Sequence, residues 1–259
     1  VLKRYRYSLL LYFTEGREHE EIHALQMLQE RYADGMILIN LRMTQRLIET
    51  INQSASPLVI SCISAILLGG QAMDHYDYVG VDSEKGMYQL TLHFIRQGHT
   101  RIGYIGGFPD ADVFTERYRG YCRALADNHL ALDPSIVHWG GNVEADGIAA
   151  AEHFLADPHV PTAVCSANDI MAIGALRTFE TQGLRVPGDL AIAGMGDIDL
   201  GTHIRPRLTS VALAQSDIGQ TAAEILMKRL HAPVQEPCHR VIFEPRLVVR
   251  ESSVDARFE

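Results

Sequence analysis

The stretch Pro161–Gly194 constrains the fold most strongly, because it reads as one complete strand–helix–strand unit. Residues 162–166 form a short apolar run of strand length. Asn168 and Asp169 follow as a helix-start signal, since short polar side chains accept the free N–H groups of a first turn. Apolar residues then recur at helical spacing until Gly183, and a turn and a second apolar run complete the unit. Two strands joined by one helix predict a parallel pair with a right-handed crossover.

Five segments of the chain together point to a known family. PTAVCSANDIMAIGAL, followed by GLRVPGDLAIAG, is accompanied in a fixed order by Val81–Gly106, Arg117–Leu125, Arg205–Leu213 and Glu244–Ser252. Over about residues 6 to 253 the chain resembles the LacI/GalR family of sugar-responsive transcription regulators. The resemblance implies an α/β fold of the type I periplasmic binding proteins, in which a three-strand hinge joins two Rossmann-like α/β/α subdomains with parallel sheets. A ligand would bind in the cleft between the subdomains, at the carboxyl ends of the strands.

The resemblance also sets the expected domain limits. The N-terminal subdomain is expected to comprise residues 1–107 and 210–232, and the C-terminal subdomain residues 108–209 and 233–259. A strand is expected at Tyr7–Phe13 and an irregular segment at Ile63–Tyr78. In the family, a first strand and helix come before the strand expected at Tyr7–Phe13, and a DNA-binding helix-turn-helix comes before both. The sequence shows neither, so we expect them upstream of Val1.

Composition limits the function classes. The net charge of −9 disfavours direct contact with nucleic acid, so we expect DNA to be bound by the upstream region. Four cysteines without paired spacing indicate free thiols in the reducing cytoplasm. No apolar run approaches the roughly 18 residues that span a membrane, so we expect no membrane contact.

Enzyme motifs are weak in this chain. The segment His19–His23 matches HExxH, which can bind zinc on a helix. It lies at the polar start of a predicted surface helix, so a structural role is favoured. Gly106-Gly107 favours a crossover turn over a phosphate cradle, and Ser166 has no nucleophile-elbow sequence around it. We therefore predict no catalytic role, no metal and no cofactor.

Two residues lead the predicted effector site. Arg117, in an RxxG-Tyr pattern, matches the family arginine that reaches the effector, and a guanidinium binds hydroxyls or a carboxylate in a bidentate manner. The alternative for Arg117 is a surface or helix-start residue. Asn168 matches a cleft asparagine, with a pure helix cap as its alternative. Asp169 and Asp82 are interpreted as helix caps.

Three positions depart from the family pattern. Gly196 stands where the family often has an aspartate that accepts hydroxyls, and Asn142 where a cleft aromatic residue is usual. Lys85 stands where some relatives place an acid. Compared with the family pattern, this chain lacks the acceptor at Gly196 and carries an additional cation at Lys85. Both differences favour an anionic effector, so the hypothesis is a gluconate-like sugar acid. A Lys85 that points to solvent is the alternative. The other expected effector-binding residues are Asp197, Arg119 and Gln215.

The sequence thus predicts the effector-sensing and dimerisation domain of a cytoplasmic regulator. A small sugar or sugar acid would close the subdomains of a homodimer, and this closure would control operator binding by the upstream helix-turn-helix. The alternative from another class is a periplasmic sugar-binding protein of a transport system, because the fold is shared.

Overall fold

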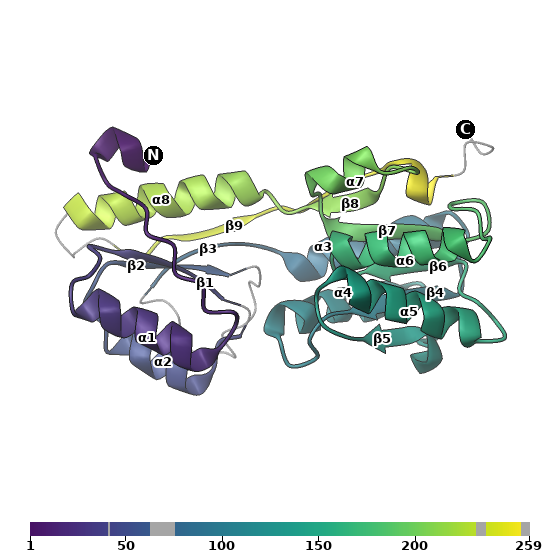
Figure 1. Ribbon diagram of the computed structural model, residues 1–259, viewed down its shortest axis with the longest axis horizontal. Coiled ribbons are helices and arrows are strands. Elements are labelled where there is room, and N and C mark those ends of the chain that lie inside the picture. The colour runs from purple at the N-terminus through teal and green to yellow at the C-terminus, as the bar shows by residue number, and fades with distance from the viewer. Residues whose placement is uncertain (41, 63–75, 232–236, 255–259) are drawn as a thin grey trace. The chain divides into compact units, whose positions relative to one another are not determined.

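The computed structural model describes residues 1–40, 42–62, 76–231 and 237–254. The chain divides into two compact units. The first comprises Val1–Val81 and Ala214–Phe243, and the second comprises Asp82–Leu213 and Glu244–Glu259. Each unit is an α/β layer structure around its own sheet, as the sequence predicted. In Figure 1 the first unit carries α1, α2 and α8, and the second carries α3 to α7.

The first unit is built on a four-stranded parallel sheet with the order β1-β2-β3-β9. Its strands are β1 (Met36–Asn40), β2 (Leu58–Cys62), β3 (Asp77–Val81) and β9 (Arg240–Phe243). Helices α1 (Glu18–Gln29) and α2 (Gln45–Asn52) cover one face, and α8 (Gln215–His231) covers the other (Figure 1). A short 3-10 helix, η1, spans Leu2–Tyr5.

Alternation along the strands explains these layers, because successive side chains point to opposite faces of a sheet. On β2, Leu58 and Ile60 pack with side chains of α1 and α2, whereas Val59 packs with Ile225 and Leu226 of α8. A parallel sheet with both faces covered requires apolar residues on both sides of each strand. The PLVISC sequence supplies them.

The strand expected at Tyr7–Phe13 is absent. This segment forms no regular element and pairs with no strand in the described part of the chain. Leu9, Leu10 and Leu11 are 66–68% exposed, and Phe13 is 81% exposed. A strand exists only through backbone hydrogen bonds to a neighbour, so apolar composition alone did not make one here.

The second unit contains a six-stranded sheet with the order β10-β8-β7-β6-β4-β5. All neighbouring pairs are parallel except β10 with β8, which is antiparallel. The strands are β4 (Ile102–Gly106), β5 (Val137–Trp139), β6 (Ala163–Ser166), β7 (Ala191–Gly196), β8 (Thr209–Ala212) and β10 (Arg246–Val248). The parallel β6–β7 pair confirms the unit predicted from Pro161–Gly194.

Seven helical segments accompany this sheet in the described residues: α3 (Ser83–Arg96), α4 (Asp112–Asp127), η2 (Pro134–Ile136), α5 (Glu144–Ala156), α6 (Asp169–Thr181), α7 (Asp199–His203) and η3 (Glu251–Ser253). Tyr104 of β4 contacts Tyr121 of α4, while the neighbouring Gly103 faces Phe154 of α5. Residues 103 and 104 point to opposite faces, so α4 and α5 cover different sides of the sheet.

Glycines let paired helices cross with their backbones in close approach. A Cβ on Gly147 of α5 would lie 1.9 Å from the Met171 backbone oxygen of α6. One on Gly174 of α6 would lie 2.3 Å from the Glu144 backbone oxygen of α5. Gly120 of α4 approaches the Glu84 backbone oxygen of α3 in the same way. No larger residue fits at these three positions without a backbone shift.

The observed units differ from the expected domain limits of 1–107 plus 210–232 and 108–209 plus 233–259. The structure changes unit at Val81 rather than at Gly107, because β4 pairs with β5 and β6 in the second sheet. The last two strands also belong to different sheets, β9 to the first and β10 to the second. Residues 63–75 of the expected irregular segment Ile63–Tyr78 lie outside the described residues.

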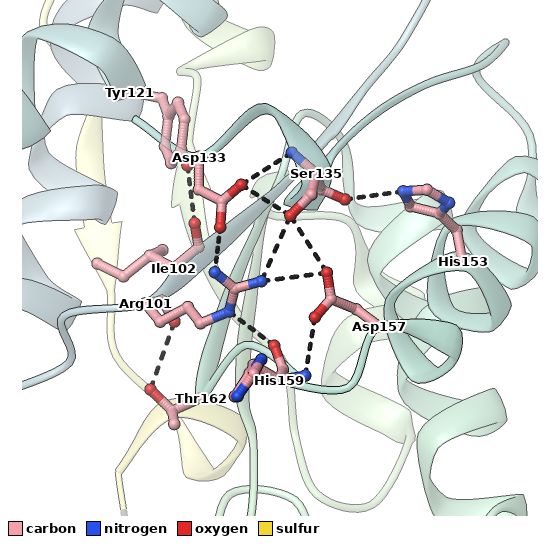
Figure 2. A network of polar contacts seen from close by, with 9 residues as sticks. All are labelled: Arg101, Ile102, Tyr121, Asp133, Ser135, His153, Asp157, His159 and Thr162. Carbon is pink, nitrogen blue, oxygen red and sulfur yellow. Dashed lines mark hydrogen bonds and ion pairs between the residues drawn. The ribbon is translucent and has the colours of Figure 1, made fainter. Parts of the chain in front are cut away.

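An ion cluster around Arg101 closes the amino ends of β4 and β6 (Figure 2). The Arg101 Nε donates to the His159 backbone oxygen at 2.6 Å, and its Nη2 lies 3.2 Å from the Asp157 carboxylate. Asp133 forms a further ion pair with Arg101, and Ser135 donates to both aspartates. The hydrogen bonds from Ser135, together with Arg101, lower the pKa of Asp133. This cluster occupies the amino end of the sheet and leaves the carboxyl end as the place to look for a ligand.

Candidate functional site

The strand β4 ends in Gly106 and Gly107, and an aromatic ring covers each glycine. A Cβ on Gly106 would lie 2.6 Å from the Trp139 ring, and one on Gly107 would lie 2.4 Å from the Phe114 ring. Trp139 also contacts Tyr118 edge-on, with ring centroids 5.1 Å apart. The sequence predicted a crossover turn at this glycine pair. The structure shows that the glycines make room for two aromatic side chains at the carboxyl end of the sheet.

Arg117 lies in the second turn of α4, which begins at Asp112, so it is not the helix-start residue of the alternative interpretation. Its side chain is 4% exposed. The Nη1 atom donates to the Ala167 backbone oxygen at the end of β6, and the guanidinium lies 5.7 Å from the Phe114 ring centroid. Burial lowers the pKa of Arg117 to about 10, against the opposing effect of Tyr104, Asp169 and Glu116. The guanidinium therefore stays charged near neutral pH, in a place where water solvates it poorly.

Asn168 is the N-cap of α6. Its Oδ1 accepts from the Met171 N–H at 2.7 Å, and its Nδ2 donates to the Asn142 backbone oxygen at 3.1 Å. The cap predicted from the sequence is therefore present. Asn142 lies in the connection between β5 and α5, and it is exposed. The hydrogen bond between the two residues joins the ends of β5 and β6.

Asp169, which is 2% exposed, forms hydrogen bonds to residues at the ends of β7 and β8. Its carboxylate accepts from the Ser210 hydroxyl at 2.6 Å and from the Ile198 N–H at 2.9 Å. Burial raises its pKa, although these two hydrogen bonds oppose the shift. Gly196 has a φ of 138°, and a Cβ there would lie 3.3 Å from the Asp169 carboxylate. Glycine is favoured at this position because other residues rarely adopt such a φ.

Asp197, the next residue, forms an ion pair with Arg250 at 2.6 Å between Oδ1 and Nη2. Its backbone N–H donates to the Ser210 hydroxyl at 2.9 Å. We call Phe108, Phe114, Arg117, Asn142, Asn168 and Asp197 the carboxyl-end cluster. They follow β4, β5, β6 and β7 within the second unit, and the contacts above link their segments.

The remaining predicted site residues lie elsewhere. Lys85, in the first turn of α3, forms an ion pair with Glu244 at 2.5 Å, and Asp82 caps this helix as predicted. Arg119 is exposed and stands roughly 200° around α4 from Arg117, so it points away from the carboxyl-end cluster. Gln215 is the exposed first residue of α8 in the first unit.

The HExxH segment does not form a metal site in the part of the chain that the structure describes, where no group of three potential ligands is suitably placed. His19 lies on the exposed start of α1. Glu20 accepts from the Tyr12 hydroxyl at 2.5 Å, and Glu21 points into the core, 4% exposed. Within the same described ranges, no helix is both long and apolar enough to span a membrane.

Known proteins resemble this chain in sequence over most of its length. Residues 91–253 match the family model of the periplasmic binding protein-like domain. The HTH-type transcriptional repressor PurR of Aliivibrio salmonicida is 33% identical over 95% of this chain and 72% of its own. The chain belongs to the LacI family of transcription regulators. Catabolite control protein A of Priestia megaterium is 28% identical over 94% of this chain and 73% of its own.

Solved structures of LacI-family regulators share the fold. A complex of the transcriptional regulator CelR with cellobiose has a TM-score of 0.81 at 29% identity, covering 91% of this chain and 71% of that chain. The transcription regulator CcpA of Lactococcus lactis has a TM-score of 0.81 at 24% identity, covering 98% and 90%. The chain is thus an effector-binding domain of the LacI-family type, and its relatives are regulators rather than enzymes.

Sequence reasoning missed the aromatic members of the carboxyl-end cluster. Phe108 and Phe114 flank the start of α4, in a segment that was given no element. The signal was the adjacent Gly106-Gly107 pair, because consecutive glycines at a strand end leave room for large neighbouring side chains.

Proposed function

We propose that this LacI-family chain senses a small sugar or sugar acid at the carboxyl-end cluster and thereby controls operator binding by an upstream helix-turn-helix. The buried guanidinium of Arg117, which donates to the backbone oxygen of Ala167 directly before Asn168, carries the proposal. A charged donor and an amide on adjoining segments can bind vicinal hydroxyls or a carboxylate, and hydrogen bonds hold both side chains in position before a ligand arrives. Preorganisation of this kind lowers the entropic cost of binding.

Relatives support a carbohydrate effector. CelR, at 29% identity, was solved in complex with cellobiose. A gluconate-like acid remains within the proposal because Arg117 could pair with a carboxylate. The second cation suggested by the sequence is weaker support, since Lys85 already has Glu244 as a partner.

The proposal includes dimerisation in the cytoplasm and reciprocal coupling between effector and operator. If an effector changes operator affinity, operator DNA must change effector affinity by the same factor. This coupling requires that the effector binds the two states of the regulator with different affinities.

The test uses the full-length regulator with its own operator. Gel-shift titrations with and without monosaccharides, disaccharides and their acids should identify a compound that changes operator affinity by tenfold or more, about 1.4 kcal/mol. The Arg117→Ala variant should still bind operator but lose the response. A response that persists in Arg117→Ala would contradict the site. Sedimentation analysis of the same protein tests the dimer.

A further inference from the structure

Two cations of the second unit that an acidic ligand could seek already have a carboxylate partner. Lys85 pairs with Glu244 at 2.5 Å, and Arg250 pairs with Asp197 at 2.6 Å. Each pair places an anion directly beside the cation that an acidic ligand would seek. A carboxylate or phosphate arriving here would compete with a protein carboxylate for the same guanidinium or ammonium group.

Two buried carboxylates also act on the charge of Arg117. Asp169 and Glu116 are 2% and 1% exposed, and both interact electrostatically with the Arg117 guanidinium. Buried charges act strongly on one another because little water screens them. The two carboxylates favour the charge on Arg117 and oppose the approach of an anion. Arg117 is therefore suited to donate hydrogen bonds to neutral oxygen or nitrogen atoms.

Aromatic surface at the cluster comes from an unexpected place. The position where an aromatic residue was expected is Asn142, whose backbone oxygen is bonded to Asn168. Phe108, directly after Gly107, is half-buried and stands edge-on to Phe114, with centroids 6.4 Å apart and an interplanar angle of 65°. Phe114 in turn lies against Gly107 and beside Arg117. Aromatic carbon and hydrogen-bond donors thus meet at the ends of β4 and β6.

We infer that Phe108 determines specificity by stacking on an uncharged ring of the effector, whose polar edge is bound by Arg117 and Asn168. This inference rests on the proposed function and narrows its ligand class. Both a pyranose, through its C–H face, and a nucleobase, through its π face, are uncharged rings of this kind. The observations disfavour sugar acids and sugar phosphates.

Calorimetric titration of the full-length regulator with matched pairs tests the charge preference. The pairs are glucose with gluconate, cellobiose with cellobionate, and adenine or guanine with the corresponding nucleoside monophosphate. The uncharged member of the binding pair should bind about tenfold more tightly or better. Comparing the sugar pairs with the nucleobase pairs shows whether the protein binds a pyranose ring or a nucleobase ring.

Variants at position 108 test the stacking. Phe108→Ala should weaken binding of the uncharged ligand about tenfold, and Phe108→Tyr should restore it to within about threefold. Tyr88→Ala is the control, because Tyr88 of α3 packs against Arg123 in the same unit, 4.7 Å from its guanidinium. It should leave ligand affinity unchanged.

The outcomes separate the inference from the proposed function. If an acidic member binds more tightly, or if Phe108→Ala binds like the wild type while operator control by a sugar persists, the inference is overturned and the proposed function stands. If only a nucleobase binds and controls operator affinity, the inference holds and the sugar class of the proposed function is replaced. If no compound in the panel binds the wild type, both are overturned.

Discussion

The guanidinium of Arg117 donates a hydrogen bond to the backbone oxygen of Ala167, the residue that directly precedes Asn168. One contact therefore connects α4 to the end of β6 and brings the two leading candidates of the sequence to the same place. It also means that Arg117 has a structural role besides the proposed ligand role.

Arg117→Met should lower both stability and effector affinity. The substitution leaves Asp169 and Glu116 buried without their cation and the Ala167 oxygen without its donor. We expect a loss of about 2–4 kcal/mol in the free energy of unfolding, measured by urea denaturation. Arg119→Met, on the exposed side of the same helix, should change it by less than about 0.5 kcal/mol. Equal effects of the two substitutions would contradict the buried role of Arg117.

Gly147→Ala should destabilise the second unit, because the new Cβ would lie 1.9 Å from the Met171 backbone oxygen. We expect a cost of about 3 kcal/mol from the forced separation of α5 and α6. Gly219→Ala is the matched control, since Gly219 is in α8 and a Cβ there meets nothing within 4 Å. That variant should gain about 0.5–1 kcal/mol from helix propensity. Thermal unfolding would reveal the opposite signs, and a shared sign would refute the packing argument.

Glu21 should make the first unit less stable as pH rises. Burial, together with the nearby Glu18, raises the pKa of Glu21 from 4.5 to about 7. A carboxyl group with a raised folded-state pKa contributes stability that is complete below about pH 4.5 and is lost as pH rises through 7. Relative to the wild type, Glu21→Gln should therefore gain up to about 3 kcal/mol between pH 5 and 8. Glu30→Gln, exposed just after the same helix, should follow the wild-type pH profile in denaturation experiments.

Asp77→Asn should be costly at neutral pH and nearly harmless in acid. Asp77 is 3% exposed and accepts from Arg229 at 2.6 Å and from the His239 N–H at 2.8 Å. Burial alone would raise its pKa, but these hydrogen bonds lower it below the ordinary 3.8. The carboxylate thus contributes stability above about pH 4, which is lost as pH falls through the folded-state pKa.

We expect Asp77→Asn to lose about 3 kcal/mol at pH 7, since it leaves Arg229 without a buried counter-charge. Asp127→Asn, at the exposed end of α4, should lose less than about 0.5 kcal/mol. A wild-type-like denaturation midpoint for Asp77→Asn at pH 7 would count against this buried ion pair.

The sequence predicted most elements, because periodicity and caps are local signals. The caps Asp82 and Asn168 and the parallel β6–β7 pair all agree with the prediction. The failures have non-local causes. Whether Tyr7–Phe13 pairs depends on a neighbouring strand, and whether β4 joins the first or second sheet depends on β5 and β6.

In the candidate site, too, local features were predictable from the sequence and long-range contacts were not. Arg117 and Asn168 could be placed together because each follows a recognisable motif. The ion pairs Lys85–Glu244 and Asp197–Arg250 join residues far apart in the chain, so their charge compensation was invisible in the sequence. The sugar-acid hypothesis depended on an uncompensated Lys85, and it loses that support.

Only Glu244 and Pro245 separate β9 from β10, yet these two strands belong to different sheets. The last strand of the first unit, β9, comes after residues 82–213 of the second unit in the chain. A ribosome therefore cannot finish the first unit until it has made residues 82–213 of the second unit. Expression of residues 1–81 alone would yield a sheet without β9, and any workable dissection of this protein must splice distant pieces of the gene.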